Sequence, residues 1–281
     1  MNSVFFSSLL KTQHPKFLEV LLGLPTISNF KLLDNTSDIW LRDYMPIQIG
    51  TNKFVQFSLT KDYYYQKDRY KRTNPALICK ALGIEPLIPI YNDQPIYLDG
   101  GNVILSPSRT KAIITEKVFD DNKIPPDLLQ GLLQEVLQVE QVIFIPVEPD
   151  DDTGHSDGMV RFIEDNMVIA NDYSKIDVSQ NFKDGFYGAL SGSGLDVLLA
   201  PYNPVNMMVD GLWAAIGCYI NFLQVEENIF LPTFDDPAND EAAIERFGKI
   251  FDLGNVIPVP SRDLALGGGV LNCLSWEISS C

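Results

Sequence analysis

The sequence is poor in several residues on which protein chemistry often depends. Its 281 residues include only two histidines, His14 and His155. The four cysteines are Cys79, Cys218, Cys273 and Cys281. They form no C-x-x-C pair, so neither a structural metal site nor a disulfide framework is expected. So few cysteines suit a reducing compartment, and we expect a cytoplasmic location.

Basic residues and long apolar runs are also scarce. Lysine and arginine number 21 against 37 aspartates and glutamates, which gives a formal net charge of −16. Such a charge repels nucleic-acid phosphates and attracts cations, so we expect a small cationic ligand and no nucleic-acid partner. No run reaches the ~18 apolar residues of a membrane span, and no basic residue precedes the short apolar run at 4–10. We therefore expect no membrane partner and no signal peptide, while a homo-oligomer stays open.

What the sequence does contain is a globular composition, 46% hydrophobic and 21% charged, arranged in a repeating layout. Pairs of apolar segments are typical of β-hairpins at residues 45–57, 102–114, 158–170 and 218–231, and a further strand is predicted at 271–274. Helical spacing or helix-start signals follow most hairpins, at 75–82, 125–137, 177–190 and from 239. The pattern predicts a unit of hairpin, helix and strand.

One polar residue stands at the head of each hairpin and gives the repeat its period. These residues are Asp43, Asp99, Asp157, Asn221 and Cys273. They lie about 52 to 64 residues apart, and a fifth of the chain is about 56 residues. Five such units predict a closed α/β ring that forms one domain over residues 1–281. In such a ring the hairpin heads converge on one pocket.

His155 is the histidine best placed for catalysis, because it lies in an acidic loop that enters an apolar strand. On an extended segment His155 and Asp157 would share one face, which would place an imidazole beside a carboxylate. The alternative is a solvated acidic turn.

Cys273 follows three consecutive glycines, Gly267 to Gly269, which permit a close backbone approach or a sharp bend. A thiol at this position is a candidate nucleophile, and the alternative is a buried thiol that acts as a small apolar side chain. Cys79 and Cys218 lie in apolar runs and are predicted to be structural.

The remaining candidates are carboxylates and an indole. Alternation along a predicted strand puts Trp40 and Arg42 on one face and Asp43 on the other. Asp99 precedes a glycine pair. A guanidinium ligand suits this set, because carboxylates grip its planar fork, an indole face attracts its charge and a thiolate can add to its carbon.

Four blocks of the chain resemble the agmatine deiminase and bacterial peptidylarginine deiminase family of guanidine-modifying enzymes. They are residues 40–46, 98–102, 154–158 and 267–273, in the family's order. The resemblance implies the pentein fold, a five-bladed pseudo-symmetric α/β propeller of repeating ββαβ units with its active site on the axis. It also implies hydrolysis of a guanidino compound without a metal or an organic cofactor.

The resemblance implies a role for each matching residue. Cys273 is implied to be the nucleophile and His155 the general acid and base, while Asp43 and Asp157 clamp the guanidinium and Asp99 fills the family's acidic position. Further substrate contacts are predicted at Trp40, Arg42 and Gly268. The chain departs from the family at Asp99, Met45 and Asn272, where Glu, Gly and His are usual, and these departures leave the substrate open.

Agmatine is the first substrate we expect, converted to N-carbamoylputrescine and ammonia through a covalent thiouronium intermediate on the cysteine. Peptidyl-arginine or free arginine is the second, and Arg42, Arg161 or Arg262 could then pair with an α-carboxylate. An amidinotransferase would pass the group to an amine instead of water.

Two other classes of protein remain as alternatives. A metal-dependent hydrolase would use the acidic loop, with Asp150, Asp151, Asp152, His155 and Asp157 as its ligands. A single histidine is weak evidence for a zinc site, and a run of acidic residues more often forms a solvent-exposed surface. The other alternative is a catalytically silent propeller that serves as a binding module.

Overall fold

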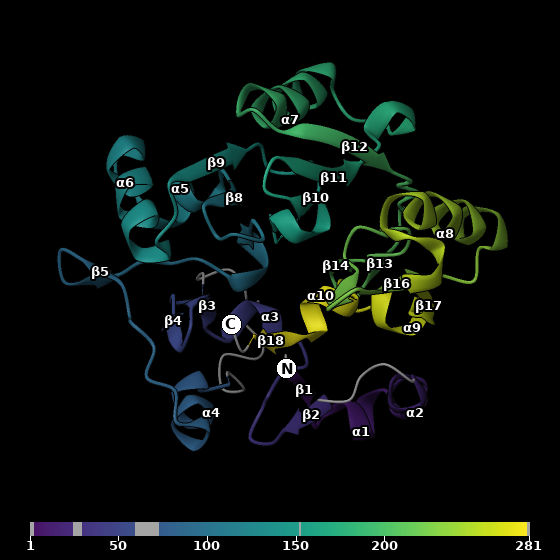
Figure 1. Cartoon of the computed structure of the whole chain (residues 1–281), viewed down its shortest axis with the longest axis horizontal. Helices are drawn as coiled ribbons and strands as arrows, with labels where there is room; N and C mark the ends of the chain where they lie inside the picture. Colours follow the sequence, from purple (N-terminus) through teal and green to yellow (C-terminus); the bar gives the residue numbers. More distant parts are fainter. Residues whose placement is uncertain (1–2, 25–29, 60–72, 152, 280–281) are drawn as a thin grey trace. The chain divides into compact units, whose positions relative to one another are not determined.

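The computed structural model describes residues 3–24, 30–59, 73–151 and 153–279 and has an α/β fold (Figure 1). Asp152 and Cys281, both named in the sequence predictions, lie outside these residues. The chain divides into two compact units. The terminal unit comprises Met1–Arg42, Asn171–Ile176 and Leu199–Ser280, and the central unit comprises Asp43–Ala170 and Asp177–Leu198.

The terminal unit packs helices against strands that come from both ends of the chain. Its elements are β1 (Ser3–Ser7), α1 (Leu10–Gln13), α2 (Pro15–Gly23), β2 (Phe30–Leu33), η3 (Tyr173–Lys175), β13 (Met208–Val209), β14 (Leu212–Trp213), β15 (Leu223–Val225), β16 (Asn228–Thr233), α8 (Pro237–Phe251), η4 (Leu253–Asn255), β17 (Val256–Pro260), α9 (Arg262–Ala265), α10 (Leu271–Leu274) and β18 (Trp276–Ile278). Its core includes Phe6, Leu21 and Phe230, and α10 contributes Leu271 and Leu274 to the same core. The turn that carries Cys273 is therefore anchored by its own apolar neighbours.

The central unit has the same kinds of element. They are β3 (Ile47–Gly50), β4 (Lys53–Val55), α4 (Pro75–Leu82), β5 (Ile90–Tyr91), β6 (Gln94–Pro95), η1 (Gly100–Asn102), β7 (Ile104–Leu105), β8 (Lys111–Thr115), α5 (Lys117–Asn122), α6 (Pro126–Leu137), β9 (Gln141–Ile145), η2 (Ser156–Gly158), β10 (Val160–Glu164) and α7 (Gln180–Gly192). Strands β11 (Met167–Asn171) and β12 (Asp196–Ala200) begin in this unit and end in the terminal unit, and α3 (Leu41–Tyr44) contains the boundary between Arg42 and Asp43. Its core includes Val55, Leu98, Ile114, Leu129 and Leu133.

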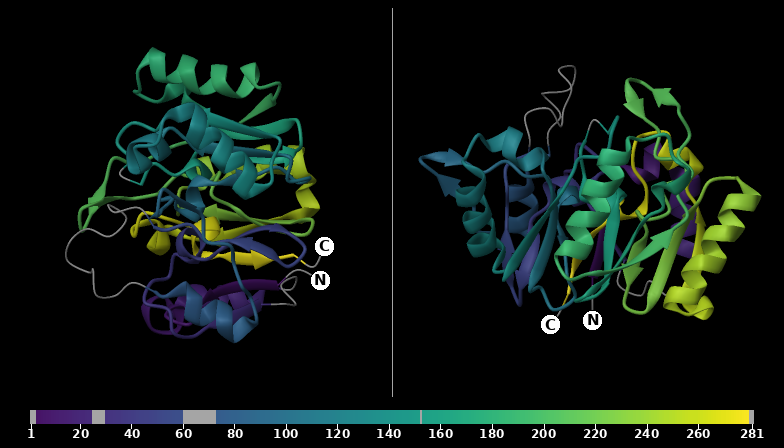
Figure 2. Two further views of the ribbon diagram at one scale, coloured as in Figure 1. Left: turned by 90° about the vertical axis from the view of Figure 1, so that its left-hand side faces the viewer. Right: turned by 90° about the horizontal axis from the view of Figure 1, so that it is seen from above.

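Several sheets share the predicted layout of hairpin, helix and strand. In β7-β8-β9 an antiparallel pair is followed by α6 and then by β9, parallel to β8. The sheets β15-β16-β17 and β18-β1-β2 repeat this pattern, with α8 and α2 before the parallel strand. A parallel partner requires a crossover, and the helix provides it while it covers the sheet, as α8 does against β16 and β17 (Figure 2).

The predicted helices are confirmed within a few residues, as α4, α6, α7 and α8. Three predicted strand segments are wrong. Residues 41–44 and 271–274 are the helical turns α3 and α10. Residues 219–222 are irregular chain before β15, and Cys218 forms only an isolated antiparallel bridge with Tyr202.

The physical reason is clearest at α10. The main-chain N–H groups of Asn272 and Cys273 donate to Asn221, at 3.1 and 3.3 Å, rather than to a neighbouring strand. These long-range hydrogen bonds thus override an apolar pattern that fits either structure, and the strand of this unit, β18, begins only at Trp276.

Among the described residues, no helix has the length and apolar character that crossing a membrane requires.

Candidate active site

His155 lies in the central unit at the end of a loop that its neighbours hold in place. The carboxylate of Asp151 accepts hydrogen bonds from the main-chain N–H groups of Thr153 and His155, at 2.8 and 3.2 Å. The Thr115 hydroxyl donates to the Gly154 carbonyl at 2.6 Å. These hydrogen bonds hold Thr153, Gly154 and His155 in place, and His155 enters η2 from an extended conformation. The prediction of an extended segment through Asp157 is wrong, because Ser156–Gly158 is a 3₁₀ turn.

The imidazole of His155 lies between two carboxylates. Its Nε2 is 3.2 Å from Oδ2 of Asp99, and its Nδ1 is 3.5 Å from Oδ1 of Asp43. All three side chains are buried, with residue exposures of 6, 2 and 6% for His155, Asp99 and Asp43. The structure thus brings together the predicted imidazole and two predicted carboxylates, while Asp157, equally buried, follows in η2.

These carboxylates decide the charge of the imidazole. Burial by itself lowers the pKa of His155, but the charges of Asp43, Asp99 and Asp157 and the hydrogen bond with Asp99 outweigh burial and raise this pKa to about 10. His155 therefore carries a proton at neutral pH. Three carboxylates around one imidazolium leave this cluster acidic, which suits a cationic ligand.

Gly101 permits this cluster to form. Its main-chain N–H donates to Oδ1 of Asp43 at 3.2 Å, so the carboxylate approaches the backbone closely. A Cβ at this position would overlap the same oxygen and would lie 2.7 Å from Nδ1 of His155. The glycine pair after Asp99 is thus explained by close packing of the cluster.

We expect Gly101→Ala to displace Asp43 or His155 and to lower the free energy of unfolding by about 1–3 kcal/mol, because a methyl group is forced into a filled space. Urea unfolding measures this effect. Gly131→Ala is the matched control, since Gly131 is exposed within α6 and its Cβ would meet nothing within 4 Å. That change should be neutral or stabilising by up to about 1 kcal/mol. Equal effects of the two substitutions would contradict this account of Gly101.

Cys273 lies in the terminal unit, where one amide side chain holds it. Nδ2 of Asn221 donates to Sγ of Cys273 at 3.2 Å, and Oδ1 of Asn221 accepts from the Cys273 main-chain N–H at 3.3 Å. A hydrogen bond donated to sulfur favours the thiolate over the thiol. Asn221 is a candidate functional residue that the sequence reasoning used only to mark the repeat. Its signal was a polar residue inside the apolar run at 219–223, and the structure buries it.

The three glycines before Cys273 lie against Trp40. A Cβ on Gly269 would lie 2.8 Å from Cζ3 of the indole, and one on Gly267 would lie 3.2 Å from Cζ2. Gly268 has a φ of +89°, and its Cβ would lie 3.5 Å from the Trp213 carbonyl oxygen. The glycines therefore permit a close approach, as expected, and the indole of Trp40 provides one of the groups that approach. The predicted substrate contacts of Trp40 and Gly268 stay predictions.

The other predicted residues have varied surroundings. Arg42, which does not belong to a strand, donates to Asn272, Ser275 and Glu277. Arg262 donates to the Phe234 carbonyl at 3.0 Å, and Arg161 lies on β10.

Two further cysteines and the acidic loop are the remaining candidate residues. Cys79 and Cys218 are buried, as a structural role requires, and burial raises the pKa of Cys79 to about 11. In the described part of the chain, no group of three or more His, Cys, Asp or Glu side chains is placed to hold a metal ion. Asp151 instead orders the loop before His155.

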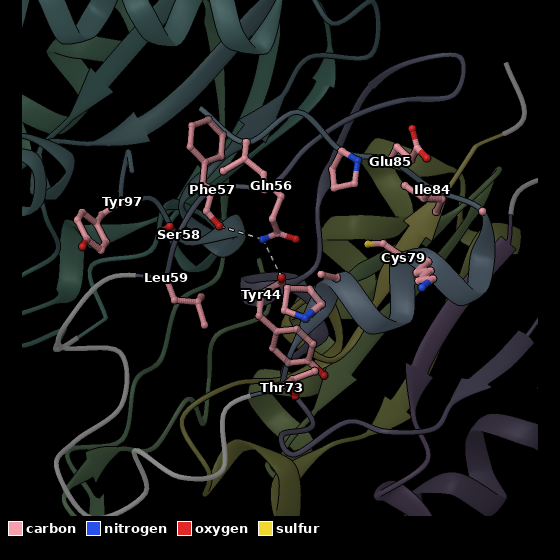
Figure 3. Close-up of a pocket in the computed structure, with 16 residues that line it drawn as sticks. Tyr44, Gln56, Phe57, Ser58, Leu59, Thr73, Cys79, Ile84, Glu85 and Tyr97 are labelled. Carbon is pink, nitrogen blue, oxygen red and sulfur yellow. Dashed lines mark hydrogen bonds between the residues drawn. The ribbon is translucent and has the colours of Figure 1, made fainter. Parts of the chain in front are cut away.

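The central unit also contains a cavity of about 750 Å³ beside α4 (Figure 3). Its lining includes Tyr44, Gln56, Cys79 and Tyr97, and none of the predicted site residues is among the described residues that line it. The amide of Gln56 donates to the carbonyls of Tyr44 and Phe57, at 3.0 and 2.9 Å. The cavity thus adjoins the chain next to Asp43 and two residues before Asp99, but the candidate catalytic groups lie outside its wall.

Comparison with known proteins agrees with these features. A sequence model of the Porphyromonas-type peptidyl-arginine deiminase family matches residues 18–278. An agmatine deiminase of Pseudomonas putida is 26% identical over 86% of this chain and 75% of its own length. A putative agmatine deiminase of Latilactobacillus sakei is 23% identical over 87% of this chain and 76% of its own.

Solved structures resemble this fold as well. The agmatine deiminase of C. jejuni has a TM-score of 0.76 at 17% identity, over 98% of this chain and 92% of its own. The resemblance found in the four sequence blocks is therefore confirmed. With its match over residues 18–278, the chain belongs to the Porphyromonas-type peptidyl-arginine deiminase family, and it is an enzyme.

Proposed function

We propose that this enzyme hydrolyses a guanidino compound to a ureido compound and ammonia, and that its substrate is agmatine. The observation that carries the proposal is the buried imidazole of His155 between Asp43 and Asp99. Burying three ionisable groups costs folding free energy, and a cluster of this kind marks a functional site. Family membership and the names of the relatives support a guanidino substrate.

The first chemical step forms a bond between Sγ of Cys273 and the guanidinium carbon. His155 then gives its proton to one nitrogen of the tetrahedral adduct, and that nitrogen leaves as ammonia. The carbon remains bound to sulfur as a thiouronium group. Asn221 donates to Sγ and favours the thiolate that this attack requires.

The second step returns the enzyme to its starting state. Water adds to the thiouronium carbon while the now neutral His155 accepts a proton from it. The adduct's remaining hydroxyl proton passes to the released ammonia or to solvent, the carbon–sulfur bond breaks, the electron pair returns to Cys273 as thiolate, and the ureido product leaves.

The carboxylates bind the substrate and adjust the imidazole. Asp43 and Asp157 clamp the guanidinium nitrogens, and Asp99 holds Nε2 of His155. A cation bound at Asp43 and Asp157 opposes the charges that raise the pKa of His155. Substrate binding therefore lowers this pKa and makes the proton easier to transfer.

The mechanism requires one closed arrangement of the whole chain. We propose a single domain over residues 1–281, a five-bladed propeller in which the four sequence blocks converge on its axis. The repeated hairpin, helix and strand in β7-β8-β9, β15-β16-β17 and β18-β1-β2 support this arrangement. Similarity to solved agmatine deiminase structures over nearly the whole chain supports it too.

We expect purified enzyme to release ammonia from agmatine with a larger kcat/KM than from arginine or the tripeptide Gly-Arg-Gly. The acidic cluster favours a cation, and agmatine has no α-carboxylate for it to repel. Ammonia and the ureido product are measured together, with putrescine present in one arm as an amine acceptor.

The other possible results distinguish between the candidate substrates and between the candidate reactions. A larger kcat/KM for the tripeptide or for arginine would replace agmatine as the substrate but would keep the reaction. An amidine transferred to putrescine would make the enzyme an amidinotransferase. Absence of ammonia release from all three compounds would refute deimination.

A further inference from the structure

Arg42 holds the chain on both sides of Cys273. Its Nε donates to the carbonyl of Asn272 at 3.3 Å, and its Nη2 donates to Oγ of Ser275 at 3.1 Å. The same Nη2 forms an ion pair with Oε1 of Glu277 at 2.8 Å. These three partners lie one residue before, two residues after and four residues after the thiol.

The carbonyl of Asn272 is the anchor of this arrangement. Besides Nε of Arg42, it accepts from the main-chain N–H and the hydroxyl of Ser275, at 3.1 and 3.0 Å. The hydroxyl of Ser275 lies 3.4 Å from Oε1 of Glu277, so the turn and the start of β18 form one hydrogen-bonded network. Arg42 supplies the cation of that network.

The same turn is also held by Asn221, which bonds to the main chain and Sγ of Cys273. Cys273 is therefore held by two sets of partners. A shift of the Asn272 carbonyl would move Cys273, the next residue, away from the Asn221 amide. A planar guanidinium can donate to a carbonyl through Nε and to a carboxylate through Nη2 at the same time. A lysine ammonium has no such fork of donors.

The ion pair itself adds little stability, because the Arg42 and Glu277 side chains are 22 and 33% exposed. The arrangement of the hydrogen bonds around Arg42 is the stronger evidence for its role. The Arg42 guanidinium donates to three partners within its own unit. It is therefore placed to orient the turn, rather than to bind a substrate group.

We propose that Arg42 is a positioning residue that fixes the turn at 271–274 so that Sγ of Cys273 stays on the Asn221 amide. This proposal deepens the proposed function and rests on it for the kinetic readout alone. Alkylation of Cys273 reports the state of the thiol whatever the substrate is.

The test compares Arg42→Gln, Arg42→Lys and Glu277→Gln with the wild-type protein. Iodoacetamide labelling of Cys273 is followed by mass spectrometry of its peptide across pH, and kcat and KM are measured for agmatine. Arg246→Gln is the matched control, because Arg246 also donates through Nε to a carbonyl, that of Leu199 at 2.7 Å, but on the exposed side of α8.

We expect Arg42→Gln to raise the pH midpoint of labelling by about one unit, the size expected for loss of one hydrogen bond to the thiolate. We expect kcat to fall by about tenfold or more, with KM within about threefold of wild type. Arg42→Lys should not restore the midpoint. Glu277→Gln keeps an oxygen for Nη2 and should shift the midpoint less, and Arg246→Gln should leave it unchanged.

Two results would overturn the proposal. A rise in KM with an unchanged labelling midpoint would make Arg42 a substrate contact. A lower unfolding temperature with an unchanged midpoint in Arg42→Lys or Arg42→Gln would leave Arg42 a purely structural role. If no guanidino compound is a substrate, the labelling profile still decides the role of Arg42, and the proposed function fails separately.

Discussion

Replacing Cys273 with alanine should abolish ammonia release from agmatine, with a fall in kcat on the order of 10⁴-fold or more. The thiolate is the group that forms the covalent intermediate, and the Asn221 amide that donates to it cannot replace it as a nucleophile. The substitution removes one buried atom from a turn anchored by Leu271 and Leu274, so the protein should stay folded. Continuous ammonia measurement and circular dichroism check the two parts of this prediction.

Cys79→Ala is the matched control, because Cys79 is also a buried thiol but lies on α4 beside the cavity of Figure 3. Its turnover should equal that of the wild-type protein. Near-normal ammonia release by Cys273→Ala would refute the nucleophile assignment. Labelling with 2-chloroacetamidine adds a test of convergence: Cys273 should react in the wild-type protein and more slowly in His155→Gln, and equal rates would refute a joint site.

Replacing Asp99 with asparagine should lower the pKa of His155 from about 10 and reduce kcat about 10²- to 10⁴-fold, because Asp99 supplies both a charge and a hydrogen bond to Nε2. In the pH profile of kcat/KM, the loss of activity at high pH should begin at a lower pH than in the wild-type enzyme. The chain has only two histidines, so NMR of labelled imidazole rings reads the change directly. His14 is the internal control, and burial lowers its pKa.

The raised pKa of His155 also makes the free energy of unfolding depend on pH. The folded-state pKa of His155 lies above its ordinary value of 6.5, so its contribution to stability is fully present below pH 6.5 and is lost as pH rises through about 10. The difference in unfolding free energy between the wild-type protein and Asp99→Asn should therefore shrink toward pH 10. An unchanged His155 midpoint in Asp99→Asn would contradict the role of Asp99.

The sequence by itself determined which residues could carry the chemistry. With only His14 and His155 available, an imidazole mechanism had few candidates, and the three glycines drew attention to Cys273. Periodicity also found the helices and most hairpins, because side chains repeat with the geometry of the backbone. Even so, the local pattern gave strands at residues 41–44 and 271–274, where the chain forms helical turns.

The tertiary structure decided the contacts that give these residues their properties. His155 meets Asp99 across 56 residues of chain, Cys273 meets Asn221 across 52, and Arg42 meets Asn272 across 230. Hydrogen bonding, burial and charge act through space, so a pattern of neighbours in sequence contains neither the raised pKa of His155 nor the amide donor on Cys273. Residue types can be read along the chain, whereas their ionisation and orientation depend on partners that only folding brings within reach.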